Sequence, residues 1–251
     1  MQRILLTLRY DGTAYHGWQV QPNGVTVQQT LQDAIEAVTG VRSGVIGCSR
    51  TDAGVHADMF CCTFDTDSSL RGNKLCSALN FHLPHDMAVY DAREVGADFH
   101  PRYGAAGKRY VYRIWNGAQR HPAYGRYALH RNAPLDTDRM NRAAAAFVGK
   151  HDFAAFCGAG SDVQGTTERT IRACRVERQG DLVLFTVEGD GFLYNMVRIM
   201  VGTLLEIAAG RMAEDAIPAI LDSGDRSTAG PTAPALGLCL ERVFYEGGER
   251  L

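Results

Sequence analysis

The chain has 251 residues, of which 45% are hydrophobic and 22% are charged, a composition typical of a soluble globular protein with one large domain or two ordinary ones. Its formal net charge of −2 excludes a general electrostatic attraction to nucleic acid. Its most apolar segment, 196–209, is interrupted by Arg198, Gly202 and Glu206, which excludes a membrane-spanning helix there.

The beginning of the sequence and the cysteines indicate the compartment. The first residues enter strand-like sequence without a signal-peptide core or cleavage site. Seven cysteines without a Cys-x-x-Cys pair argue against a secreted disulfide framework and against a zinc ribbon. We therefore expect a cytoplasmic protein with reduced, mostly buried thiols and no metal site.

The first half of the chain is predicted to have the element order β-α-β-β-α-β. Alternating apolar residues predict a strand over 4–10. Thr26 and Gln29 predict a capping box at the start of a helix, and Gly40 its end. The remaining predicted elements are strands near 44–49 and 58–65, a helix near 69–80 and a strand near 87–95.

The second half is predicted to repeat this order, with a short extra helix near 213–222. Its elements are a strand over 109–115, a helix over 136–148, strands near 169–178 and 181–188, a helix near 193–209 and a strand near 237–245. The repeat predicts an α+β protein with tandem ferredoxin-like halves, 1–104 and 105–251. We expect their sheets to join into one continuous mixed, largely antiparallel sheet with a central cleft.

Basic residues are concentrated in one stretch that also contains aromatic residues. Arginine provides a planar fork for phosphates and base edges, and aromatic rings provide stacking surfaces. An ordinary strand with a solvated charged face is the alternative interpretation. The basic residues are Arg102, Lys108, Arg109, Arg113, Arg120, Arg126 and Arg131, and the aromatic residues are Tyr103, Tyr110, Tyr112, Trp115 and Tyr124.

A polar loop, 47–57, lies between two apolar runs and is the most informative feature of the chain. An arginine at 50, two residues before Asp52, is consistent with a carboxylate kept ionised by its neighbour. A turn in which Asp52 only hydrogen-bonds the backbone is the alternative. His56 in the same loop is either catalytic or, as we favour, a structural hydrogen-bonding residue.

Five blocks of sequence, in a fixed order, carry a family resemblance. They are DGTAYHGWQ at 11–19 with TVQ at 26–28, SRTDAGVHA at 49–57, KRYVYRI at 108–114, the segment 192–202 around MVR, and APALGL at 233–238. Together they resemble the bacterial tRNA pseudouridine synthase A family over nearly the whole chain. The resemblance implies a pseudouridine synthase fold and isomerisation of uridine to pseudouridine at positions 38, 39 and 40 of the tRNA anticodon arm. It also implies a homodimer with tRNA across both subunits and no cofactor.

The resemblance also assigns roles to residues. It implies that Asp52 is catalytic, that Tyr110 lies against the target base, that Arg198 pairs with Asp52, and that Leu238 lines the uracil pocket. Arg50 is a candidate to fill the space that a flipped nucleotide leaves. Tyr110 either stacks on the base or accepts the C5 proton.

The chemistry explains the need for a carboxylate. Uracil must leave C1′ through nitrogen, rotate and rejoin through C5, and Asp52 can attack C1′, add to C6 or remove a sugar proton. The sequence does not choose among these routes, but each requires an ionised Asp52. The alternative functions are a noncatalytic tRNA-binding protein on the same duplicated fold and an oligomeric scaffold that binds no RNA.

Overall fold

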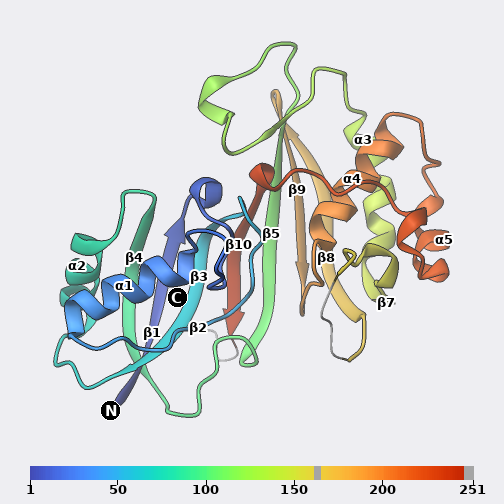
Figure 1. Ribbon diagram of the computed structural model, residues 1–251. Coiled ribbons are helices and arrows are strands. Elements are labelled where there is room, and N and C mark those ends of the chain that lie inside the picture. The colour runs from blue at the N-terminus through green and yellow to red at the C-terminus, as the bar shows by residue number, and fades with distance from the viewer. Residues whose placement is uncertain (161–164, 246–251) are drawn as a thin grey trace. The chain divides into compact units, whose positions relative to one another are not determined.

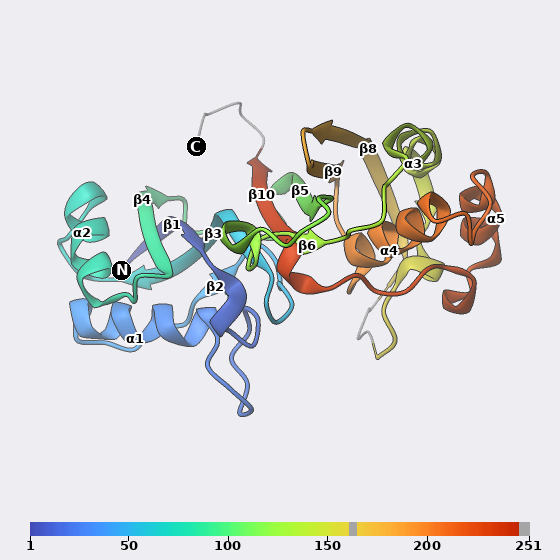
Figure 2. The ribbon, with the colours of Figure 1, turned by 90° about the horizontal axis from the view of Figure 1, so that it is seen from above.

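The computed structural model describes residues 1–160 and 165–245 (Figures 1 and 2). The fold divides into two units. Unit 1 is Met1–Ala106 together with the last strand from Cys239 onward, and unit 2 is Gly107–Leu238. No helix among the described residues is long and apolar enough to cross a membrane.

Unit 1 contains a mixed sheet with the strand order β4-β1-β3-β10, and a short β2 pairs with β3. β10 runs parallel to β3, whereas the other pairs are antiparallel. Its elements are β1 (Gln2–Tyr10), η1 (Gly12–Ala14), α1 (Val27–Thr39), β2 (Ile46–Gly47), β3 (His56–Thr66), α2 (Gly72–His82), β4 (Met87–Val95) and β10 (Leu238–Tyr245).

The helices of unit 1 lie on one side of its sheet (Figures 1 and 2). α1 buries Val27, Leu31, Ala34 and Ile35, which recur at the spacing of one helical face. β1 is buried on both faces through its centre, which accounts for the run of apolar residues there. These contacts form the core of unit 1.

Unit 2 contains a sheet with the order β5-β9-β8-β7, and β6 runs parallel to β5. Its strands are β5 (Ala105–Trp115), β6 (Leu129–His130), β7 (Gly149–Asp152), β8 (Glu168–Gln179) and β9 (Leu182–Gly189). Its α-helices are α3 (Thr137–Ala144), α4 (Met196–Ala208) and α5 (Ala216–Ser223). Its 3-10 helices are η2 (Pro122–Tyr124), η3 (Ala145–Phe147), η4 (Ala154–Phe156), η5 (Arg226–Thr228) and η6 (Ala235–Gly237).

Burial around nearly the whole circumference of α4 explains why this segment is the most apolar in the sequence. α4 packs against α3, and α3 packs against β8. The long apolar stretch is therefore a core helix of unit 2.

The α+β class and the repeated β-α-β-β-α-β order are confirmed by these elements. The predicted strand near 44–49 is reduced to β2, and the predicted helix over 136–148 ends at Ala144 and continues as η3. β6 and β7 were not predicted, because strands this short carry little periodicity.

The last strand lies in a different unit from the one that the predicted division of the chain at 104/105 gives it. Chain order places it in the second half, whereas β10 pairs with β3 through Cys239 opposite His56 and Leu240 opposite Ala57, and belongs to unit 1 from Cys239 onward. A local sequence pattern specifies that a segment is extended but not which distant strand it pairs with.

Candidate active site

The loop that carries Asp52 connects β2 to β3 and is held by the segment that follows β1. The Trp18 backbone N–H donates to the Thr51 carbonyl at 3.0 Å, and the Gly54 N–H donates to the Tyr15 carbonyl at 3.2 Å. The Tyr10 and Thr51 hydroxyls lie 2.8 Å apart and share a hydrogen bond. The two sequence blocks at 11–19 and 49–57 therefore form one local structure, which fixes the backbone on both sides of Asp52.

Two glycines permit this close approach. A Cβ at Gly12 would lie 2.0 Å from the Val55 carbonyl oxygen. Gly17 has φ +84° and a Cβ there would lie 2.6 Å from the Thr51 carbonyl oxygen, so both conformation and space require glycine. The spacing of the glycines in the first block thus follows from the path of the loop that carries Asp52.

The side chains of the loop differ in exposure. Asp52 is half-buried and Arg50 is exposed, so Arg50 is accessible to a large partner such as RNA. His56 is only 4% exposed, and its Nδ1 accepts the Gly12 backbone N–H at 3.0 Å. This geometry supports the structural interpretation of His56.

Tyr110 and Tyr112 are alternate residues of β5 in unit 2, so both project from the same face of that strand. Tyr110 is 6% exposed and its ring meets Phe192 edge-on, with centroids 5.1 Å apart. The buried Tyr112 hydroxyl donates to the Pro234 carbonyl at 2.8 Å. Burial raises the pKa of Tyr112 far above its usual value, against the lowering effect of Arg198 and Arg131, so it stays neutral.

Arg198 lies in the first turn of α4, and hydrogen bonds fix its guanidinium on two sides. Its Nε donates to the Ala233 carbonyl and its Nη1 donates to Asn195 Oδ1, each at 2.7 Å. The Ala233 N–H returns a hydrogen bond to the Arg198 carbonyl at 3.1 Å. A planar fork held in this way presents its charge in one direction, as recognition of a carboxylate requires.

The segment that leads to β10 lies directly on α4. A Cβ at Gly202 would lie 1.6 Å from the Pro231 carbonyl oxygen, and the Gly230 N–H donates to Thr203 Oγ1 at 2.9 Å. Leu238 follows η6 at the end of this segment and is 5% exposed. Arg198 is therefore anchored by the segment that ends at Leu238.

The candidate residues thus divide between the units. Arg50 and Asp52 share one loop of unit 1, and Tyr110, Arg198 and Leu238 belong to unit 2. Sequence reasoning missed Asn195, although asparagine directly before an apolar helical pattern is a common N-cap. No sequence pattern predicts the role of the Ala233 carbonyl, because every residue has a backbone carbonyl.

Most of the cysteine thiols are buried, and none of those in the described part of the chain is disulfide-bonded. Five of the seven cysteines are buried, and burial raises the pKa of Cys62 well above its usual value. Among the residues that the structure describes, no group of three or more His, Cys, Asp or Glu side chains is placed to hold a metal ion.

Comparison with known proteins places the chain in a family. A family model described as tRNA pseudouridine synthase matches residues 7–104 and 143–246. Proteins named tRNA pseudouridine synthase A from Clostridium kluyveri and Moorella thermoacetica are each 47% identical, and one from Acetivibrio thermocellus is 46% identical. Each alignment covers 98% of this chain and 100% of the relative. A chain in a crystal structure of a Cbf5–Nop10–Gar1 complex aligns with a TM-score of 0.40 and 12% identity, over 98% of this chain and 60% of that one. The match over both repeated segments and the full-length similarity show that the chain belongs to the tRNA pseudouridine synthase family.

Proposed function

We propose that the protein isomerises uridine to pseudouridine at positions 38, 39 and 40 of the tRNA anticodon arm. The observation that carries the proposal is the loop containing Arg50 and Asp52, fixed on both sides by the 10–18 segment, in a chain with full-length relatives named tRNA pseudouridine synthase A. A carboxylate on a loop whose backbone is held in this way suits a reaction in which uracil is detached and reattached at one site.

Asp52 is the proposed catalytic carboxylate. It acts in the ionised form, by attack on C1′, by addition to C6 of the base or by removal of a sugar proton. A carboxylate shielded from water needs a compensating cation, and we assign that role to Arg198. The two hydrogen bonds to Asn195 and Ala233 support this assignment, because they restrict the directions in which the guanidinium can face.

The other candidates act on the nucleotide. A base inside a stacked stem has to be flipped out, at a cost of a few kcal/mol, before it meets Asp52. Arg50, which is exposed, fills the vacated space in this proposal. Tyr110 stacks on the extruded base or accepts the C5 proton, and Leu238 lines the uracil pocket.

Release of tritium from tRNA that carries C5-labelled uridine tests the reaction, because only isomerisation exchanges the C5 hydrogen. Wild-type protein is expected to release the label, and Asp52→Asn, a neutral isostere, to lose about 10³-fold or more in rate. tRNA binding by the variant should stay within about threefold of wild type, because most binding comes from backbone contacts. Binding without label release by the wild type would favour the noncatalytic alternative.

The target positions are tested with transcripts that retain a single uridine at position 38, 39 or 40. Label release from each of the three, and none from a transcript with uridine only elsewhere in the arm, is the expected pattern. Release from one position alone would restrict the proposal to that nucleotide.

Arg198→Leu is expected to depress turnover far more than tRNA binding, because the proposed partner of Arg198 is Asp52 and not the RNA backbone. Turnover by Arg198→Leu at the wild-type rate would remove Arg198 from the site.

Tyr110→Phe separates stacking from proton transfer. The variant retains the ring and should retain activity if stacking is the main role of Tyr110.

We also propose a cytoplasmic homodimer that binds tRNA across both subunits. With a net charge of −2, RNA binding depends on local basic surface, which a dimer doubles. Light scattering coupled to gel filtration is expected to give about twice the monomer mass of 27.4 kDa. A monomer that isomerises tRNA at the full rate would contradict the dimer.

A further inference from the structure

The connection from β5 to α3 is long and has an unusual charge. Residues 116–135 contain three arginines, two histidines and no aspartate or glutamate, which gives this segment a formal charge of +3 in a chain of net charge −2. Its regular structure consists of η2 and β6, and connections of this length are usually functional. The segment is thus a local basic surface of the kind that RNA binding by a weakly acidic protein requires.

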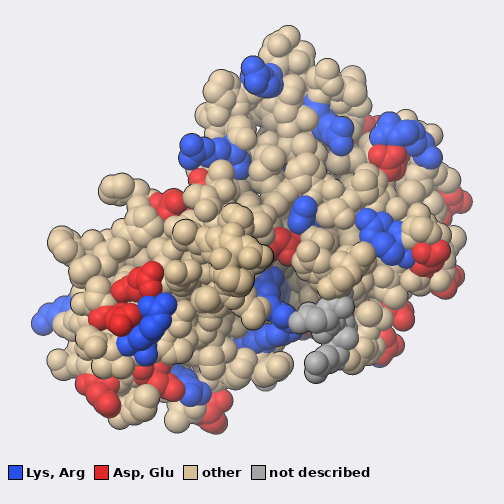
Figure 3. Space-filling view, viewed as in Figure 1, with Lys and Arg blue, Asp and Glu red and all other residues tan. Residues whose placement is uncertain are grey.

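The arginines of this segment face solvent. Arg120, Arg126 and Arg131 are all exposed, as is His121 between them. In Figure 3 the segment is at the top of the view and carries basic side chains, whereas basic and acidic side chains lie side by side over α1 on the left. The charge on the segment is therefore not balanced by acidic residues of its own.

The segment is also held by contacts among its own residues and with Trp115, the last residue of β5. Trp115 stacks on Tyr124 with ring centroids 5.2 Å apart, and His121 packs edge-on against both rings. The Asn116 side-chain amide donates to the Arg131 and Ala133 carbonyls, each at 2.8 Å. A preordered surface loses little conformational entropy on binding, which favours affinity for an extended polyanion.

From this charge, exposure and order we propose that residues 116–135 bind the phosphate backbone of the substrate tRNA, outside the nucleotide that is isomerised. The proposal rests on the proposed function for the identity of the RNA. Arginine binds phosphate oxygens with paired N–H groups, and such contacts position an RNA without reading its sequence. Residues 116–135 then determine affinity and salt dependence, while the chemistry is carried out elsewhere.

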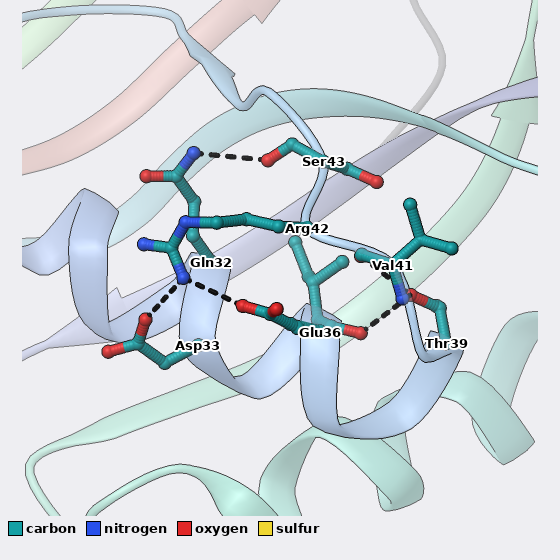
Figure 4. Close-up of polar contacts among 8 residues, drawn as sticks. Gln32, Asp33, Glu36, Thr39, Val41, Arg42 and Ser43 are labelled. Carbon is teal, nitrogen blue, oxygen red and sulfur yellow. Dashed lines mark hydrogen bonds and ion pairs between the residues drawn. The ribbon is translucent and has the colours of Figure 1, made fainter.

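The test compares a double variant, Arg120→Gln with Arg126→Gln, with the matched control Arg42→Gln. Arg42 is also a surface arginine, but it pairs with Asp33 at 2.7 Å and with Glu36 at 2.8 Å on α1 (Figure 4). Dissociation constants for tRNA are measured by fluorescence anisotropy between about 50 and 300 mM KCl, and turnover is measured at saturating tRNA.

The double variant is expected to bind tRNA about tenfold or more weakly near 150 mM salt and to reduce the slope of log K against log salt by about 1 to 2, with turnover at saturating tRNA unchanged. Arg42→Gln should match the wild type in all three measurements. If the double variant has the same tRNA affinity and salt slope as the wild type, the proposal is overturned. The surface then binds an acidic protein or has no partner. If the wild type isomerises uridine and the double variant binds tRNA normally, only the proposed role of residues 116–135 is rejected. If the wild type binds no tRNA, the proposed function is rejected as well.

Discussion

Asn195 is the one described non-glycine residue with a positive φ, 59°, and it lies directly before α4. Asparagine tolerates this left-handed conformation better than most residues do, and here its side chain also accepts the Arg198 hydrogen bond. The same residue therefore sets the start of a helix and the orientation of a guanidinium.

Substitution of Asn195 separates these two effects. Asn195→Gly keeps the backbone conformation without strain, whereas Asn195→Ala adds about 1 kcal/mol or more of strain, so urea unfolding should show the alanine variant to be the less stable. Both variants lack the acceptor for Arg198, and both should lose about tenfold in kcat with little change in tRNA affinity.

Asn195→Asp is the control, because it retains an acceptor oxygen and tolerates the left-handed region. It should recover most of the kcat that the glycine variant loses. If Asn195→Gly turns over at the wild-type rate, the hydrogen bond does not position Arg198 for catalysis.

The residues that the sequence indicated most clearly are those with an unusual side chain for their location. Asp52 stood out because it lies in a polar loop between two apolar runs. Asn195 did not, because the need for it arises from the start of α4 and from its hydrogen bond with the Arg198 guanidinium. Its backbone conformation is visible only in three dimensions.

At the scale of single elements, α1 illustrates a feature that local sequence specifies. Thr26 Oγ1 accepts the Gln29 backbone N–H at 3.3 Å, and Gly40 ends the helix with φ 75°, as the sequence predicts. Thr26→Ala is expected to reduce the free energy of unfolding by about 1 kcal/mol, because one partly buried N–H at the start of the helix loses its acceptor. Thr26→Ser, which retains the hydroxyl, should cost less than half as much in the same urea titration.

α4 depends instead on a contact that no local pattern reveals. Because a Cβ at Gly202 would lie 1.6 Å from the Pro231 carbonyl oxygen, Gly202→Ala forces the 230–234 segment away from the helix. We expect a loss of about 2 kcal/mol or more in unfolding free energy, with reduced turnover because Ala233 holds Arg198.

Gly44→Ala is the matched control, since a Cβ there meets no atom within 4 Å. Its unfolding free energy should stay within about 0.5 kcal/mol of wild type. Equal stability of the two alanine variants would show that the contact between α4 and residues 230–234 relaxes freely.

At the scale of the whole molecule, the sequence predicts the repeated order of elements but not the partner of the last strand. Helices and strands follow from local periodicity, which is why both β-α-β-β-α-β orders were predictable. The pairing of β10 with β3 joins residues that are far apart in the sequence, Cys239 with His56 and Leu240 with Ala57. Only packing in three dimensions selects this partner.

The pH dependence of stability also involves both units. In unit 1, Arg3 donates two hydrogen bonds to Asp65, at 2.9 and 3.0 Å, and these lower the pKa of Asp65. In unit 2, hydrogen bonds from Arg211 lower the pKa of Glu206. A lowered pKa in the folded state gives stability that is fully present above the unfolded values near 4 and is lost as the pH falls through the folded values.

A double-mutant cycle with Arg3→Gln and Asp65→Asn measures this effect for one pair. Urea unfolding at about pH 7 should give a favourable coupling energy, small because the pair is partly exposed to solvent and screened by salt. As the pH falls from about 7 through the lowered pKa of Asp65, the carboxylate becomes protonated, so the coupling should decrease towards zero. The cycle isolates the pair from the other hydrogen bonds of Arg3, which reach the Ala97 and Phe99 carbonyls. A coupling energy that stays constant over this pH range would mean that the two side chains are linked by packing and not by charge.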